Sequence, residues 1–187
     1  DYEQWNTYGR DILTQFITSH GPSFNQNQLT ELNFAGQGVV IDGARLTGAL
    51  DLVDIDKQAR TIRVTDYKTG KPARDWLGST DYDKIKLHKY RQQLMFYQLL
   101  VEHSRDYAGY DFTGGVLQFV EPDAKTGDIL ALEDTFSAED LDRFKQLVSV
   151  VWRKITTLDL PDTSSYEPSY KGMVQFEEEL LGEDSRF

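Results

Sequence analysis

The chain has 187 residues, a length typical of a single domain, and its 39% hydrophobic content is sufficient for an ordinary core. It contains no cysteine, which excludes disulfides, thiol catalysis and every cysteine-ligated metal site. No apolar run approaches the roughly 18 residues of a membrane span, and no signal peptide is present, so we expect a soluble, cytoplasmic protein. The first residue is Asp1 rather than Met, which suggests a fragment or a processed chain.

Helical and strand-like segments alternate along the chain. Residues 2–19 show a helical spacing of apolar side chains that Gly21-Pro22 ends, so His20 falls after the helical pattern. A second helix is predicted from about Lys84 to Val101, and a third begins with a capping box at Ser137–Asp140. Strand-like runs lie at 29–35, 38–41, 44–56, 60–67, 113–120 and 128–132. This order predicts an α/β fold in which a mixed central β-sheet is flanked by α-helices.

Two aspartates and a lysine are predicted to meet at the ends of neighbouring strands. Successive side chains of a strand point to opposite faces, so Asp66 and Lys68 emerge side by side where the apolar face of their strand ends. The short connection at residues 57–60 suits a hairpin with the preceding strand. That hairpin would bring Asp51 close to Asp66.

This group of residues suits metal-assisted phosphodiester chemistry. Hard divalent cations such as Mg²⁺ prefer carboxylate and carbonyl oxygens, so Asp51, Asp66 and the backbone carbonyl of Tyr67 are candidate ligands. Lys68 would then orient an attacking water or offset charge that develops on a phosphate oxygen.

An Asp-x-Lys triplet alone is weak support, because Asp123-Ala124-Lys125 has the same pattern. That second copy lies in a turn-like cluster between two strand-like runs, and we predict a turn there. A solvated ion pair at a strand end is the corresponding alternative for Asp66 and Lys68.

The second helix adds polar side chains to an otherwise apolar surface. Gln93 and Tyr97 are four residues apart and therefore share a face. A buried amide and phenol need partners, which a nearby active site or a nucleic-acid strand would supply. The alternative is that Gln93 caps a backbone group and Tyr97 is a core aromatic. We expect His88 and His103 to be ordinary surface residues of the helix.

Together these motifs resemble the RecB-like branch of the PD-(D/E)XK nuclease superfamily, which has a restriction-endonuclease-like core. In that family a Gly-x-x-Asp motif comes first, followed by Asp-x-Lys and then by Gln-x-x-x-Tyr on a helix. This chain has the same order at Gly48–Asp51, Asp66–Lys68 and Gln93–Tyr97.

The resemblance implies a Mg²⁺- or Mn²⁺-dependent deoxyribonuclease of the exonuclease type, which hydrolyses phosphodiester bonds of DNA. Asp51 and Asp66 would be catalytic metal ligands and Lys68 the catalytic lysine. Gln93 and Tyr97 would lie on the helix that flanks the cleft and contacts DNA. The family relation also implies a helicase or ATPase motor as partner, in a full-length polypeptide that acts in recombination and repair. The chain has no Gly-x-x-x-x-Gly-Lys-Ser/Thr loop, so the motor must lie elsewhere.

Other positions match the family less well. Glu31 corresponds weakly to an acidic residue that relatives carry on an earlier strand, and would be a further metal ligand. Leu52 stands where relatives often have arginine, and the first helix lacks the histidine that many carry. Without cysteine, the chain cannot hold the iron–sulfur cluster of some relatives. A catalytically degenerate fold that binds DNA or a protein, and a non-catalytic interaction domain, are the alternative functions.

The net charge of −11 is unlike the basic footprint of a domain that binds DNA tightly by itself. Residues 159–187 carry −6 of it, so we predict a nuclease-like domain at 1–158 and an acidic tail at 159–187, either disordered or folded back on the domain. Among the basic residues near the candidate lysine, Lys71, Arg74 and Lys89 are expected to contact the DNA backbone. A solvated basic face is the alternative.

Overall fold

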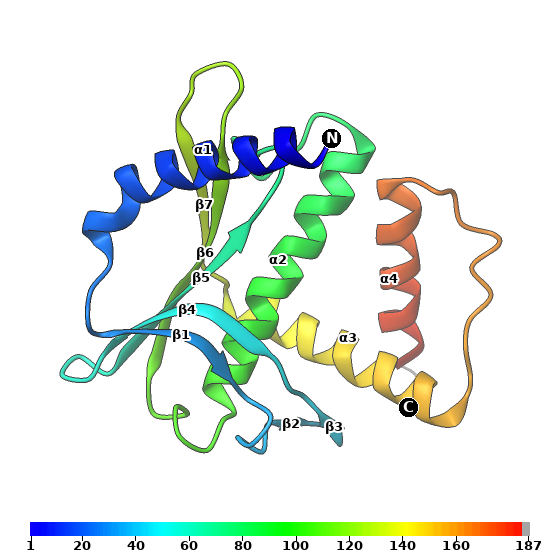
Figure 1. Cartoon of the computed structure of the whole chain (residues 1–187). Helices are drawn as coiled ribbons and strands as arrows, with labels where there is room; N and C mark the ends of the chain where they lie inside the picture. Colours follow the sequence, from blue (N-terminus) through cyan, green and yellow to red (C-terminus); the bar gives the residue numbers. More distant parts are fainter. Residues whose placement is uncertain (185–187) are drawn as a thin grey trace.

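The computed structural model describes residues 1–184 and has a mixed five-stranded sheet at its centre (Figure 1). β5 and β6 run parallel, whereas all other neighbouring strands of this sheet are antiparallel. A parallel pair needs a crossover connection, and the helix α2 (Asp81–Glu102) provides it. The predicted α/β class, with helices around a mixed sheet, is confirmed. The order of the strands is β1 (Gln28–Asn33), β4 (Ala49–Asp56), β5 (Thr61–Lys68), β6 (Asp111–Pro122) and β7 (Ile129–Asp134).

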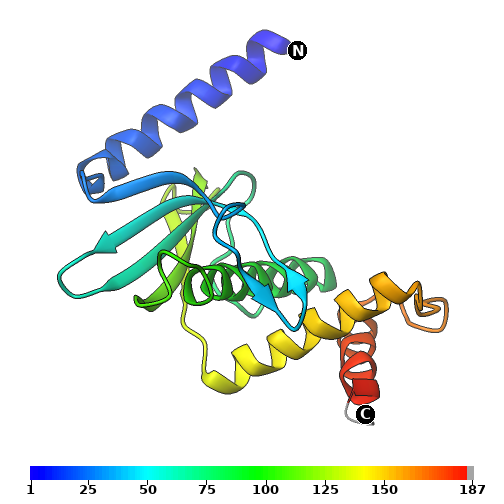
Figure 2. The ribbon, with the colours of Figure 1, turned by 90° about the horizontal axis from the view of Figure 1, so that it is seen from below.

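The helices lie on both sides of this sheet. α1 (Tyr2–His20) lies on one face, and α2 lies on the other, as Figure 2 shows. α3 (Ala138–Thr157) packs against α2, and α4 (Tyr170–Asp184) packs against α3 and α2. A short 3-10 turn, η1 (Gly21–Ser23), follows α1. Within residues 1–184, no helix is both long and apolar enough to cross a membrane.

The main hydrophobic core lies between the sheet and α2. Its centre includes Val53, Val64, Leu94 and Leu117, whose side chains are fully buried. A close approach of α2 to β6 depends on Gly115, because a Cβ atom at this position would lie 2.9 Å from Cδ2 of Leu94. The absence of a side chain at Gly115 therefore sets how near α2 comes to the strands beneath it.

The segment 44–56, predicted as one strand, is divided in the structure. Its first part forms β3 (Ala44–Arg45), which pairs with β2 (Val40–Ile41) in a separate two-stranded sheet. The chain leaves that sheet before Gly48, whose carbonyl accepts a hydrogen bond from the N–H of Phe34. β4 then joins the main sheet, so the prediction of a single strand was wrong.

The start of α2 and the end of α1 also differ from the predicted bounds. α2 begins at Asp81, three residues before the predicted start, because the side chains of Thr80 and Asp83 form a capping box. The prediction that His20 lies outside the first helix was wrong. Gly21 keeps helical angles (φ −51°, ψ −40°), so α1 continues through His20 into η1.

The acidic C-terminal segment includes α4, whose Leu180 and Leu181 are buried. On its inner face, Glu177 accepts hydrogen bonds from the side chains of His88 and Gln92 on α2, at 3.0 and 2.9 Å. His88 is therefore half-buried beneath α4, and its prediction as an ordinary surface residue was wrong. The boundary predicted at residue 158 stays a prediction, and residues 185–187 of the predicted tail lie outside the described residues.

Candidate active site

Asp66 and Lys68 lie together at the end of β5, on the face that α2 covers. The alternation along the strand is as predicted, since Ile62 and Val64 are fully buried on this face and Asp66 is only 3% exposed. The Nζ atom of Lys68 lies 2.7 Å from Oδ2 of Asp66, and both side chains are largely buried. The pair is therefore an enclosed ion pair rather than the solvated one considered as an alternative.

Lys68 has further partners on α2. Its Nζ atom donates a hydrogen bond to Oε1 of Gln93 at 2.7 Å and lies 4.4 Å from the ring centroid of Tyr90. A ring face attracts a cation because the π-system carries negative charge there. The lysine ammonium is thus held from β5 on one side and from two positions of α2 on the other.

Gln93 and Tyr97 together fix the other oxygen of Asp66. Nε2 of Gln93 and the hydroxyl of Tyr97 donate to Oδ1 at 3.0 and 2.7 Å. Burial, followed by the hydrogen bond to Asp66, raises the pKa of Tyr97, so the phenol stays protonated and acts as a donor. The alternative that Gln93 caps a backbone group was wrong, because its amide binds side chains of the site. Tyr97 is buried in the core and also contacts the site.

Asp51 reaches the same place from β4. Its Oδ2 atom accepts a hydrogen bond of 2.9 Å from the backbone N–H of Tyr67, the residue between Asp66 and Lys68. The Tyr67 ring points to the opposite face of the sheet, where it meets the ring of Phe16 edge to face at 5.8 Å. The predicted hairpin therefore does bring Asp51 to the Asp66–Lys68 segment.

The donor set fits a divalent cation held by two carboxylates. Oδ2 of Asp66 is buried, and no donor meets it with hydrogen-bond geometry, although the Lys68 ammonium is close. In the described part of the chain, no three His, Asp or Glu side chains converge to form a complete metal site. Mg²⁺ commonly uses one or two carboxylates and completes its shell with waters and substrate oxygens. Asp51 and Asp66, with the carbonyl of Tyr67, match this partial shell.

Glu31 does not join this group. It is exposed on β1 and has a left-handed backbone conformation (φ 51°), between the paired residues Thr30 and Leu32. Its role as a metal ligand stays a prediction.

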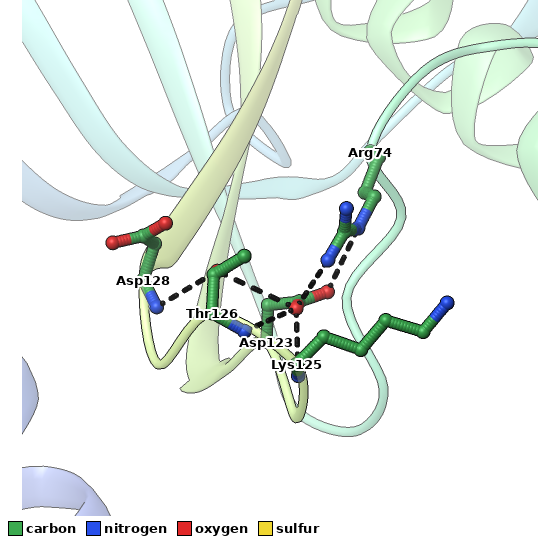
Figure 3. A network of polar contacts seen from close by, with 5 residues as sticks. All are labelled: Arg74, Asp123, Lys125, Thr126 and Asp128. Atoms are coloured by element: carbon green, nitrogen blue, oxygen red, sulfur yellow. Dashed lines mark hydrogen bonds and ion pairs between the residues drawn. The ribbon is translucent and has the colours of Figure 1, made fainter.

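The three basic residues expected to contact DNA differ in their surroundings. Lys71 and Lys89 are exposed, on the loop before α2 and on α2 itself. Arg74 instead forms a bidentate ion pair with Asp123 at 2.6 and 3.1 Å, which Figure 3 shows. The pair ties the loop to the β6–β7 hairpin, as does the hydrogen bond from Nε1 of Trp76 to the carbonyl of Glu133 at 3.0 Å.

Two residues that contact the site, Tyr90 and Glu121, had no function predicted from the sequence. The position of Tyr90, three residues before Gln93, already placed it on the same helix face. Glu121 lies near the end of β6, and its Oε1 accepts a 2.6 Å hydrogen bond from the N–H of Gly70. No local pattern marks Glu121, because its partner is 51 residues away in the sequence.

The comparisons with known proteins agree with this geometry. No curated protein matches the chain. A model of the PD-(D/E)XK nuclease superfamily matches residues 4–167, which include every residue of the site described above. Proteins of this superfamily are nucleases and generally use divalent metal ions. The chain belongs to the PD-(D/E)XK nuclease superfamily.

Proposed function

We propose that this chain is a Mg²⁺- or Mn²⁺-dependent deoxyribonuclease domain of the RecB-like branch, acting as an exonuclease. The observation that carries the proposal is the enclosed contact of Lys68 with Asp66 and Gln93, with Asp51 bound to the adjacent Tyr67 peptide. An isolated structural ion pair would need neither the second aspartate nor the glutamine.

Each residue of the site has a distinct task in hydrolysis. Asp51 and Asp66 would hold the cation, with the Tyr67 carbonyl as a further ligand. A divalent cation at such a site binds the scissile phosphate and lowers the pKa of a water. Because Gln93 and Tyr97 both bind Oδ1 of Asp66, Oδ2, which lies beside the Lys68 ammonium, is the oxygen that would bind the cation.

Lys68 would position the attacking water or bind a phosphate oxygen. An ammonium group has three N–H donors, and the hydrogen bond to Gln93 uses one of them, while the charge of Asp66 lies 2.7 Å away. A remaining N–H would donate to the water or to a phosphate oxygen. A preorganised donor of this kind typically contributes about a hundredfold to a thousandfold in rate.

The domain would work as part of a larger cytoplasmic helicase–nuclease in recombination and repair, with a motor domain that supplies most of the DNA affinity. The net charge of −11 supports this division, because sequence-independent DNA affinity rises with the number of phosphates that basic residues neutralise.

The test is cleavage of linear single-stranded and double-stranded DNA with Mn²⁺ by the wild type, by Lys68→Ala and by Lys125→Ala. Lys125 belongs to the second Asp-x-Lys triplet and is exposed, so it is a matched control. We expect cleavage by the wild type and by Lys125→Ala, and loss of cleavage in Lys68→Ala. Equal cleavage by all three proteins would contradict the task of Lys68. DNA binding without cleavage would instead identify a catalytically degenerate fold.

A further inference from the structure

The first half of α1 exposes aromatic side chains. Tyr2, Trp5 and Tyr8 are 81%, 70% and 48% exposed, and Phe16 is the buried residue of the helix. Figure 2 shows that the N-terminal half of α1 extends beyond the sheet, away from the other helices. A contiguous exposed aromatic surface on a small domain commonly marks a binding site.

The exposed aromatic rings lie on or beside the inward face of α1. Trp5, Gly9, Ile12 and Phe16 recur with helical spacing and share one face, and Phe16 packs onto the Tyr67 ring of the sheet. Trp5 continues this face toward the N-terminus, and its side chain is largely exposed. Tyr8 is adjacent, with its ring at 6.1 Å from that of Trp5 in an edge-to-face arrangement.

This aromatic surface is connected to the candidate active site. The Tyr8 hydroxyl donates to Oε2 of Glu121 at 3.3 Å, while Oε1 of the same carboxylate binds the N–H of Gly70. Gly70 is two residues after Lys68. Both carboxylate oxygens of Glu121 are therefore engaged by this contact chain from α1 to the site.

The edge of the site next to this surface also carries positive charge. Lys71 is exposed directly after Gly70, and the Nζ atom of Lys86 on α2 reaches the carbonyl of Lys71 at 3.4 Å. Aromatic rings that stack on bases, next to cations that bind the backbone, are the usual combination in sites for single-stranded nucleic acid.

We propose that Tyr2, Trp5 and Tyr8 form a stacking platform for unpaired bases of a single DNA strand that runs past Lys71 to Lys68. The inference rests on the proposed nuclease function and names the form of substrate that the site receives. A duplex hides the faces of its bases within its own stack, so the platform favours single strands.

The test measures binding of a fluorescent single-stranded oligonucleotide and of the matching duplex at low salt, with EDTA to prevent cleavage. The variants are Trp5→Ala, Trp5→Phe and Trp152→Ala, the last being a control tryptophan on α3 that is 39% exposed. We expect Trp5→Ala to weaken single-strand binding by about tenfold, as for the loss of one stacking ring. Duplex binding by Trp5→Ala, and all binding by Trp152→Ala, should match the wild type. Trp5→Phe keeps an aromatic ring and should lose less single-strand binding than Trp5→Ala.

Several results would overturn the platform. These are no single-strand binding by the wild type, unchanged binding by Trp5→Ala, or equal losses for single strand and duplex. A wild-type dimer that dissociates in Trp5→Ala would also overturn it, by assigning the surface to a second copy of the chain. The nuclease proposal is judged separately by Mn²⁺-dependent cleavage. If single-strand binding depends on Trp5 but the wild type does not cleave DNA, only the nuclease proposal is contradicted. If the wild type cleaves DNA but binding does not depend on Trp5, only the platform is contradicted.

Discussion

Asp66-Tyr67-Lys68 and Asp123-Ala124-Lys125 share one sequence pattern but have different structures. In the first triplet, β5 places the aspartate and the lysine on one face, with 2.7 Å between Nζ and Oδ2. In the second, the chain turns directly after β6, and the Asp123 carboxylate accepts the backbone N–H groups of Lys125 and Thr126 at 2.9 and 3.0 Å. The Lys125 side chain extends away from Asp123 in Figure 3. The turn predicted for the second triplet is confirmed.

The two aspartates also differ in what their oxygens can still bind. Both oxygens of Asp123 accept hydrogen bonds from Arg74, and these bonds, with those from the turn, hold the pKa of the carboxyl well below its usual range. Oδ2 of Asp66 lacks such a donor. The same triplet therefore gives a carboxylate that can accept a cation when it lies on a strand beneath α2, and a saturated carboxylate when it lies in a turn.

The largest expected difference is in cleavage by the two aspartate variants. Asp66→Asn removes a charge that the proposed metal site needs, so we expect cleavage with Mn²⁺ to fall by about a hundredfold or more. Asp123→Asn should cleave DNA like the wild type at temperatures where it is folded. Thermal unfolding of both variants checks that the fold survives. Similar losses in both would remove the functional distinction between the triplets.

Gly115→Ala would disturb the first triplet through the position of α2. The new methyl group would press on Leu94, next to Gln93, and overpacking of this kind costs about 1–3 kcal/mol. Urea unfolding measures the loss of stability, and cleavage should fall as well. Gly127→Ala, in the β6–β7 hairpin, is the contrasting variant. A Cβ atom there meets nothing within 4 Å, so the substitution strains only the left-handed backbone (φ 76°) and leaves α2 in place. Full cleavage by a destabilised Gly115→Ala protein would show that the site tolerates displacement of α2.

Tyr90→Leu tests how Lys68 is held. Loss of the cation–π contact should lower kcat by about three- to tenfold with little change in KM, because the ring contacts the lysine rather than the substrate. Tyr90→Phe retains the ring and should retain activity. An equal loss in Tyr90→Phe would show that the hydroxyl, and not the ring face, is what matters.

The smallest effect is expected for Arg74→Ala, which removes an exposed partner of Asp123. At neutral pH we expect a Tm lower than that of the wild type by a few degrees. Because the pKa of Asp123 is lowered in the folded state, this stabilisation is fully present above the unfolded pKa of about 3.9 and is lost progressively as the pH falls from there through the lower pKa of the folded carboxyl. The difference in Tm should therefore shrink in acid. A difference in Tm that stays constant from pH 7 to the lowest pH at which both proteins fold, well below pH 3, would show that the ion pair does not cause it.

The parts of the site that follow from local periodicity were predictable from the sequence. Alternation along a strand placed Asp66 beside Lys68, and helical spacing placed Gln93 beside Tyr97. The hairpin that brings Asp51 close also followed from its short connection.

Contacts between distant segments were not predictable in this way. Glu121 meets Gly70, and Asp123 meets Arg74, because the parallel pairing of β5 with β6 brings their ends together. The extension of α1 through His20 depended on the helical angles of Gly21, a residue that permits many conformations. The two side-chain contacts were decided by tertiary structure rather than by local preference.

The most direct measurement is Mn²⁺ binding by isothermal titration calorimetry for the wild type, Asp66→Asn and Asp123→Asn. The proposed site predicts saturable binding by the wild type and by Asp123→Asn, and a clear loss of affinity in Asp66→Asn. Wild-type protein that shows no saturable binding, or Asp66→Asn that binds Mn²⁺ as the wild type does, would contradict a metal site at the Asp66–Lys68 triplet.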